Sequence, residues 1–248
     1  MNYRLLDVGD TAVTVEFGQR IDPALLATVA ACDQAVLAAQ AAGRLPGLVE
    51  TVPTFRSLTL IYDPLQTSRA AIDPVLHALF SAPLSLPDKA MRLWCLPVCY
   101  GGELGPDLEA MASALGLSPA EVVERHAAET YRVYMLGFLP GFPFMGDLPP
   151  ALSLPRRHEP RLRVPAGSVA TAGQLTAIYP WESPGGWHLL GRCPVPLFSA
   201  RWPDAALFRP GDQVRFHAVD TGEYAELEDR WRTDSQLPTE YLLQESPH

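Results

Sequence analysis

Lysine is almost missing from this chain of 248 residues: Lys89 is the only one, and the other basic residues are arginines. This excludes a phosphate-binding loop of the GxxxxGK[ST] type, because Lys89 follows Asp88 rather than glycine. A lysine-linked cofactor would have to use Lys89, which lies in the polar stretch "LPDKAM", a poor setting for a desolvated amine. The formal net charge of −9 argues against nucleic acid or an anionic membrane as a partner.

Cysteine and long apolar runs are scarce as well. Cys95 and Cys99 lie in the strand-like run "MRLWCLPVCY", where four residues of strand separate them by about 13 Å, too far for a disulfide or a shared zinc ion. We expect the four cysteines to be reduced and mostly buried, and we expect no metal site, since the histidines lack ligand spacing. The N-terminus lacks the apolar core of a signal peptide, which favours a cytoplasmic protein.

The first third of the chain has the order strand, strand, helix, strand, strand, helix. The runs "YRLLDV" and "TAVTVEFG" precede a helix over residues 23–42, capped by Asp22. The runs "GLVETV" and "SLTLIYD" and a helix over residues 68–80 follow. This order predicts a small α/β sandwich over residues 1–85, and the Pro-rich "SAPLSLPDKA" indicates a linker to a second domain over residues 86–248.

The second domain is predicted to be dominated by short strands. After the strand around Cys95, helices are expected over residues 105–115 and from Ser118, where "SPAE" forms a capping box. From Tyr131 onward, short β-like runs are separated by Gly/Pro turns: "YRVYMLGF", "RVPAGSVATA", "LTAIYP", "WHLLGR" and "DQVRFHAV". This spacing predicts a small β-barrel or sandwich, with a last helix near residues 223–231 and an α+β class for the whole chain.

Three Gly/Pro-rich segments are candidate functional loops: "GFLPGFPFMG", "RLRVPAGSVATAG" and "IYPWESPGGWHLLGR". Glycine permits close backbone approach and proline stiffens a loop, so backbone amides there can face an anion. Tight barrel turns explain the same composition. The candidates for binding a substrate or an anion are Arg161, Arg163, Pro165, Gly167, Ser168, Tyr179, Gly185, Gly186, Trp187 and Arg192.

Arginine and histidine supply the candidates for chemistry. A guanidinium binds a carboxylate or phosphate through two parallel hydrogen bonds, although a surface ion pair is the alternative for each arginine. Catalytic residues stay unassigned, with Arg161, Arg192 and His188 as candidates. His188 needs an acidic group to orient it as a base, and Glu182 is the nearest in sequence; a structural role is the alternative.

Other polar residues in these segments receive narrower roles. Arg192 is expected to share an anion site with the Gly185–Gly186 turn. Arg156 and Arg157 are further arginine candidates, but adjacent side chains diverge. Ser168 lies outside a GxSxG elbow, so we expect its hydroxyl to hydrogen-bond a loop, and Asp212 in "RPGDQV" is expected to stabilise its own turn.

The three segments together resemble the B subunit of the prokaryotic ATP-dependent 5-oxoprolinase, a family that also includes the KipI-type sporulation kinase inhibitor and allophanate hydrolase subunit 1. The residues that carry the resemblance are "YMLGFLPGFPFMG", "VPAGSVATAGQLTAIYP" and "SPGGWHLLGRCPVPLF", with support from "YGGELGPDLE" and "RPGDQVRF". At Asp147 the family more often has glycine. The resemblance implies a small N-terminal α/β domain followed by a cyclophilin-like β-barrel.

The resemblance also implies a function that no single chain performs. The complex opens 5-oxo-L-proline to L-glutamate at the expense of ATP with Mg²⁺, and the nucleotide is expected mainly on other subunits. The expected partners are a C-subunit homologue (KipA-type) and an A-subunit homologue (LamB/YcsF-type). Inhibition of a sensor histidine kinase and half of an allophanate carboxyltransferase are the alternatives.

The uncharged loop is the candidate contact surface for the C-subunit homologue. No residue from Val133 to Gly146 carries a charge, and obligate interfaces between subunits are apolar. The expected anchors are Phe138, Pro140, Phe142 and Phe144.

Overall fold

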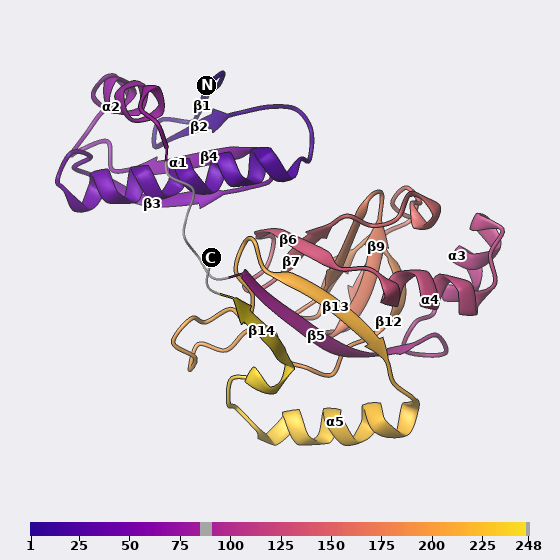
Figure 1. Ribbon diagram of the computed structural model, residues 1–248. Coiled ribbons are helices and arrows are strands. Elements are labelled where there is room, and N and C mark those ends of the chain that lie inside the picture. The colour runs from indigo at the N-terminus through magenta and orange to yellow at the C-terminus, as the bar shows by residue number, and fades with distance from the viewer. Residues whose placement is uncertain (85–90, 247–248) are drawn as a thin grey trace. The chain divides into compact units, whose positions relative to one another are not determined.

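The computed structural model describes residues 1–84 and 91–246. The chain divides into two compact units, Met1–Lys89 and Ala90–His248, shown in Figure 1. The boundary predicted between residues 85 and 86 lies outside the described residues, as does Lys89. Each unit has its own hydrophobic core.

The first unit has the strand and helix order that the sequence predicts. Its elements are β1 (Arg4–Val8), β2 (Ala12–Glu16), α1 (Pro23–Ala41), β3 (Leu48–Pro53), β4 (Ser57–Tyr62) and α2 (Arg69–Ser81). The strands form one antiparallel sheet in the order β1-β2-β4-β3. Leu58, Leu60 and Tyr62 alternate toward the helices along β4, so the two helices and one face of the sheet share a core.

Both helices of the first unit begin where the sequence places their caps. Asp22 accepts a hydrogen bond from the Ala24 amide, and the Ser68 side chain accepts one from the Ala71 amide. Among the described helices, α1 is the one with the length and apolar composition to cross a membrane. It packs in the core of the first unit, where Cys32 and Val36 are fully buried.

The second unit is a mixed structure of strands and helices. In chain order it contains β5 (Met91–Tyr100), α3 (Leu108–Leu115), α4 (Pro119–Ala128), β6 (Tyr131–Leu136), β7 (Pro143–Gly146), η1 (Pro150–Leu152), β8 (Arg161–Val164), β9 (Ser168–Ala172), β10 (Leu175–Ile178), β11 (Ser183–Gly185), β12 (His188–Arg192), β13 (Gln213–Ala218), α5 (Thr221–Thr233), η2 (Thr239–Tyr241) and β14 (Leu242–Ser246).

Seven of these strands close into a barrel. Their order is β12-β9-β10-β7-β6-β13-β5, and pairing of β12 with β5 completes the ring, while β14 adds to the outer edge of β5. β8 and β11 form a separate two-stranded sheet. Figure 1 shows the barrel with α3 and α4 beside it and α5 below β5 and β14. The predicted α+β class, with a small α/β domain followed by a barrel, is confirmed.

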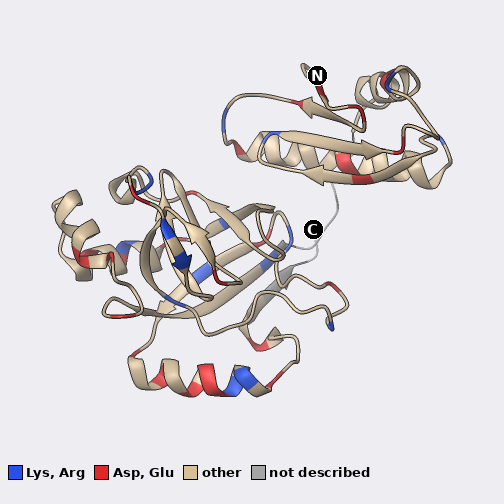
Figure 2. Cartoon of the chain, turned by 180° about the vertical axis from the view of Figure 1, so that it is seen from behind, with Lys and Arg blue, Asp and Glu red and all other residues tan. Residues whose placement is uncertain are grey.

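The helices around the barrel also follow local sequence signals. Ser118 and Glu121 form the predicted capping box of α4. α5 carries acidic residues along its length and arginines toward its C-terminal end, an arrangement that complements the helix dipole and is visible in Figure 2. The four cysteines are free thiols, and three of them are buried, as predicted.

Two turns near the barrel have a left-handed backbone that glycine normally supplies. The run "RVPAGSVATA" forms two strands rather than one, because Gly167 turns the chain between β8 and β9 with φ of 78°. Asp147, at the position where the family more often has glycine, adopts φ of 70°. Its carboxylate accepts a hydrogen bond from the Tyr134 hydroxyl at 3.1 Å, which helps an aspartate to occupy this position.

Candidate functional site

A buried carboxylate, that of Asp107 just before α3, lies at the centre of the candidate site. Its Oδ1 accepts hydrogen bonds from Arg157 Nη1 at 2.8 Å and from Arg161 Nη2 at 2.6 Å. Its Oδ2 accepts one from the backbone amide of Leu189 on β12 at 2.7 Å. Asp107 precedes α3 but its side chain makes no capping hydrogen bond to it, and the helix begins at Leu108 rather than at residue 105.

Glycine brings Asp107 close enough to β12 for these bonds. A Cβ atom on Gly105 would lie 2.0 Å from the Leu190 carbonyl oxygen, so no other residue fits there without moving the loop. The Gly101 amide donates to that same oxygen at 2.9 Å. The stretch "YGGELGPDLE" thus folds onto β12 as a fixed platform for the Asp107 side chain.

Residues 155–161 contain Arg156, Arg157 and Arg161 and are called the arginine loop. Backbone contacts hold this loop against the other predicted segments. The Arg157 amide donates to the Gly186 carbonyl oxygen at 2.8 Å, and Arg161 on β8 pairs with Gly185 on β11. The structure therefore brings Arg161, Gly185 and Gly186 together, as the sequence suggests, and adds Asp107 and Arg157 to them.

The cluster carries excess positive charge. Burial raises the pKa of the Asp107 carboxyl, but the Arg161 hydrogen bond, the Leu189 amide and the two guanidinium charges outweigh burial and lower it below its usual value. Asp107 is therefore ionised at neutral pH and shared between two arginines. Buried Arg157 Nε and Arg161 Nη1 have no hydrogen-bond partner among the described residues, so the cluster has donors to spare.

Tyr179 lies between this cluster and an aromatic core. A Cβ atom on Gly185 would lie 2.4 Å from the Tyr179 hydroxyl oxygen, so glycine allows the hydroxyl to approach the β11 backbone. Burial raises the pKa of Tyr179, and the charges of Arg156 and Arg161 oppose the rise. The hydroxyl thus stays protonated at neutral pH, close to two guanidinium groups, where it can donate a hydrogen bond but cannot act as a base.

His188 and Arg163 have other partners. His188 Nε2 donates to the Pro155 carbonyl oxygen at 2.9 Å, which ties β12 to the start of the arginine loop. Glu182 does not orient His188; its Oε1 accepts a hydrogen bond from Arg163 Nε at 2.8 Å. The side chains of Arg163 and Glu182 are 78% and 51% exposed, so their ion pair is a surface one.

Arg192 does not join the Gly185–Gly186 turn, and that expectation is wrong. Arg192 ends β12, four residues beyond His188, which places it about 13 Å further along the strand. Its positive charge acts on the Tyr224 hydroxyl of α5, where it opposes the rise that burial and Glu228 cause in the pKa of Tyr224.

Ser168 and its neighbours lie at this same end of β12. Ser168 pairs with Arg192 across the β9–β12 ladder and is fully buried, and its Oγ has no partner among the described residues. We expected the Ser168 hydroxyl to hydrogen-bond a loop, but it forms no hydrogen bond with the described residues. Pro165 and Gly167 form the turn before it, and the Gly167 amide donates to the Tyr179 carbonyl oxygen at 2.7 Å.

The uncharged aromatic loop is divided between core and surface. Phe142 is 1% exposed and packs edge-on against Tyr179, with ring centroids 5.0 Å apart, and it shares a core cluster with Trp187. The prediction that Phe142 anchors a partner is therefore wrong, because its side chain is buried in this aromatic cluster of the chain itself. Phe144 is half-buried, whereas Phe138 is 64% exposed and Pro140 is exposed.

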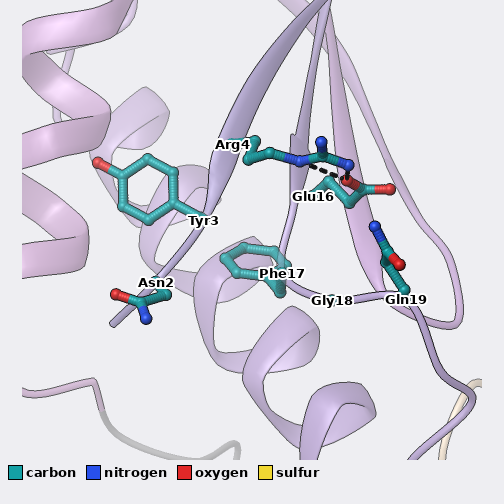
Figure 3. A pocket seen from close by; sticks show the side chains of 7 residues that line it. All are labelled: Asn2, Tyr3, Arg4, Glu16, Phe17, Gly18 and Gln19. Atoms are coloured by element: carbon teal, nitrogen blue, oxygen red, sulfur yellow. Dashed lines mark hydrogen bonds and ion pairs between the residues drawn. The ribbon is translucent and has the colours of Figure 1, made fainter.

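A separate hollow of about 240 Å³ lies in the first unit. Figure 3 shows Arg4 against Glu16, with Tyr3 and Phe17 beside them. Glu16 is already paired with Arg4 and Arg56, and Tyr3 packs on Phe17 and Phe80, so the groups that line the hollow serve the fold. None of the predicted site residues lies in it. In residues 1–84 and 91–246, no group of three or more His, Cys, Asp or Glu side chains could hold a metal ion.

Sequence reasoning missed Asp107. We interpreted "GELGPDLE" as the start of a helix, for which an aspartate is an ordinary residue. The available signal was the density of glycine before it, at positions 101, 102 and 105, which indicates a backbone in close contact with another strand. The partner strand itself, β12, could not be identified without the fold.

Comparisons with known proteins agree with the fold. Residues 3–208 match the family described as carboxyltransferase domain, subdomain C and D, and the chain belongs to this family. Among its relatives, the chain is similar to the 5-oxoprolinase B subunit of Bacillus subtilis (strain 168), at 36% identity over 90% of this chain and 96% of the relative. It is similar to the 5-oxoprolinase B subunit of Escherichia coli O157:H7 at 40% identity over 84% of this chain and 93% of the relative. The predicted resemblance is confirmed.

Solved structures show the same fold. The crystal structure of TTHA0988 matches 84% of this chain at 41% identity with a TM-score of 0.72, and this chain spans 40% of that protein's length. The structure of the urea amidolyase of K. lactis matches 92% of this chain with a TM-score of 0.77, over 15% of its own length. The identity there is 19%, so that likeness concerns the fold alone.

Proposed function

We propose that this chain is a non-autonomous component of a multi-subunit 5-oxoprolinase that converts 5-oxo-L-proline to L-glutamate with ATP. The observation that carries the proposal is the similarity to the B subunit of Bacillus subtilis, over 96% of that relative's length. One subunit of such an enzyme requires the others. We propose homologues of the A subunit (LamB/YcsF-type) and of the C subunit (KipA-type) as partners, in the cytoplasm.

The chemistry of the arginine cluster supports a binding role within such a complex. Arg157 and Arg161 offer guanidinium donors, and the protonated Tyr179 hydroxyl offers another. These groups bind and orient an anion, but they provide neither a nucleophile nor a base. ATP, bound with Mg²⁺ mainly by other subunits, supplies the activation of the amide that ring opening requires.

The loop around Phe138 is the proposed contact surface for the C-subunit homologue. Phe138 and Pro140 are exposed there, and Trp181, 46% exposed, donates its Nε1–H to the Pro140 carbonyl oxygen at 3.0 Å. The Trp181 ring also packs on Phe198, with centroids 6.0 Å apart. An apolar surface already fixed in shape suits a stable contact between subunits, because little conformational entropy is lost on binding.

Reconstitution tests the proposal directly. The chain is purified alone and together with its two partner homologues, and ATP-dependent release of glutamate from 5-oxoproline is measured. We expect turnover by the full set and none by the chain alone. Turnover by the chain alone contradicts the non-autonomous role, and no turnover by the folded full set contradicts the 5-oxoprolinase assignment.

A carboxyltransferase role is the second candidate. The chain is 26% identical over 133 residues to a putative urea carboxylase of Emericella nidulans, covering 50% of this chain. This role requires a biotinylated partner and carboxylation of urea, so biotin-dependent consumption of bicarbonate in the presence of urea distinguishes it from ring opening of 5-oxoproline. Inhibition of a sensor histidine kinase is the third candidate, which an autophosphorylation assay with the added chain tests.

A further inference from the structure

We propose that Arg157 and Arg161, held by Asp107, bind the carboxylate of the substrate, so that this chain recognises the acid group of 5-oxoproline. The inference rests on the proposed function and deepens it. 5-Oxoproline has two polar parts, a lactam that must react and a carboxylate that does not. A site that binds without reacting suits the second part.

The two arginines hold hydrogen-bond donors that Asp107 does not use. Arg157 and Arg161 each give one hydrogen bond to the same oxygen of Asp107. Arg157 Nε and Arg161 Nη1 are buried, with no partner among the described residues. A buried N–H group that forms no hydrogen bond is destabilising, so in the working protein these donors are expected to meet an acceptor.

The two guanidinium groups are held in place before any ligand binds. A single carboxylate fixes both guanidinium groups, and Asp107 is itself fixed by the Leu189 amide and by the close approach at Gly105. Arginines that are fixed before the ligand arrives lose little side-chain entropy on binding it. The two side chains are 32% and 24% exposed, so part of each arginine is open to a small ligand, and the covered Arg157 Nε and Arg161 Nη1 reach it after a small local movement.

The charges around Asp107 sum to a small positive value. Arg156, Arg157 and Arg161 carry three positive charges, and Asp107 and the exposed Glu159 carry two negative ones. The remaining balance of one positive charge matches a monoanion such as a carboxylate. A triphosphate would meet strong repulsion from Asp107, which the two arginines keep ionised. The Tyr179 hydroxyl, close to Arg156 and Arg161, adds a neutral donor beside the same site.

The test uses the reconstituted complex and two ligands that differ only in charge. 5-Oxoproline is the substrate, and 5-oxoprolinamide, with a neutral carboxamide in place of the carboxylate, is the competitor. Arg161→Gln and Arg157→Gln are compared with wild type. We expect the KM for 5-oxoproline to rise about ten- to one-hundredfold in either variant, because each removes charge-assisted hydrogen bonds, and we expect the inhibition constant of the amide to change less than about twofold.

A matched control separates recognition from damage to the fold. Arg215→Gln makes the same chemical change on the exposed side of β13, where Arg215 Nε donates to Thr130 Oγ1 at 2.7 Å, and its KM should equal that of wild type. Thermal unfolding of each variant chain is measured alongside. Arg161→Lys is a second test, since lysine keeps the charge but not the bidentate geometry, and it should restore only part of the affinity.

Three results would overturn the proposal. The first is an unchanged KM for 5-oxoproline in folded, active Arg161→Gln and Arg157→Gln complexes. The second is an equal loss of affinity for 5-oxoproline and its amide. The third is a rise confined to the KM for ATP, which would assign the arginines to phosphate. If the wild-type complex itself has no 5-oxoprolinase activity, the proposed function fails, and that outcome is distinct because it appears before any variant is made.

Discussion

Among the described residues of the barrel unit, two buried carboxylates are held by arginine, and they differ in what surrounds them. Asp212 accepts hydrogen bonds from Arg92 through both oxygens, and also from Trp94 Nε1 at 3.3 Å and the Arg209 amide at 2.8 Å. Arg92 is itself 9% exposed. Asp107 is equally buried, but its two arginines reach solvent and keep unused donors.

The pKa values of the two carboxyl groups change in opposite directions. Burial raises the pKa of Asp212, and Arg92 offsets only part of the rise, whereas at Asp107 the two arginines outweigh burial and the pKa falls. One carboxylate with one buried arginine makes a balanced pair that serves the fold. One carboxylate with two partly exposed arginines leaves positive charge for a ligand. Burial of an ion pair therefore does not by itself identify a functional site; the surplus of donors does.

Removing the arginine of the balanced pair should have the largest effect on stability. Arg92→Ala leaves the Asp212 carboxylate buried without a cation, and we expect a loss of about 3–5 kcal/mol in the free energy of unfolding. Arg163→Ala is the matched control, because it breaks an exposed ion pair with Glu182, and it should cost less than about 1 kcal/mol. Urea unfolding of both variants measures the difference. Equal losses would show that burial does not separate the two pairs.

The same contrast holds for two aromatic residues of the uncharged loop. Phe142 is 1% exposed in the cluster with Tyr179 and Trp187, whereas Phe138 is 64% exposed. We expect Phe142→Ala to cost about 3–5 kcal/mol through loss of contacts and a cavity, and Phe138→Ala about 0.5 kcal/mol or less. Chemical denaturation of the isolated chain compares them. A small effect at Phe142 would mean that this part of the barrel is loosely packed.

The sequence predicts elements well where a local signal determines them. The caps at Asp22 and Ser118, the strand around Cys95 and the turn role of Asp212, which accepts the Arg209 amide, all follow from neighbouring residues. Contacts between distant segments have no such signal. Asp107 meets Leu189 across 82 positions of sequence, and Asp212 meets Arg92 across 120. Neither pairing is visible until the barrel closes.

Closure of the barrel also explains the errors. Phe142 and Phe138 look alike in the sequence, but the turn between β6 and β7 buries Phe142 against Tyr179 and leaves Phe138 exposed. Arg192 shares a segment with Gly185 and Gly186, but β12 carries it to the opposite end of the strand. Distance along a strand, rather than membership of a motif, decides which residues form a site.

A third buried polar group, His126, should make the stability of the barrel unit depend on pH. His126 is fully buried between the Tyr100 hydroxyl, 2.8 Å from Nδ1, and Thr176 Oγ1, 3.0 Å from Nε2. Burial lowers its pKa from 6.5 to about 3. Because the folded protein keeps this histidine neutral while the unfolded chain binds a proton below pH 6.5, its contribution to stability is lost as the pH falls from 6.5 toward 3.

The effect of His126 should appear in the slope of the free energy of unfolding against pH. We expect the free energy of unfolding of wild type to fall by up to about 1.4 kcal/mol per pH unit more than that of His126→Gln over this range. Glutamine does not titrate and can still hydrogen-bond, so the difference isolates the histidine. Urea unfolding at a series of pH values from neutral down to about pH 4 measures it. Parallel pH profiles would mean that the histidine is protonated in the folded barrel.

The smallest expected effect on stability concerns the backbone of Phe138, which adopts φ of 68°. A residue with a Cβ atom is strained there and glycine is not, so Phe138→Gly should be more stable than Phe138→Ala by about 1 kcal/mol, the reverse of the usual order. Thermal unfolding of the isolated chain tests this.

An exposed aromatic in a strained position stabilises the free chain little, which suggests that its ring serves a contact. Both variants should therefore bind the C-subunit homologue at least about tenfold more weakly in a titration, in keeping with an aromatic anchor. Wild-type affinity in both would remove Phe138 from the proposed contact surface.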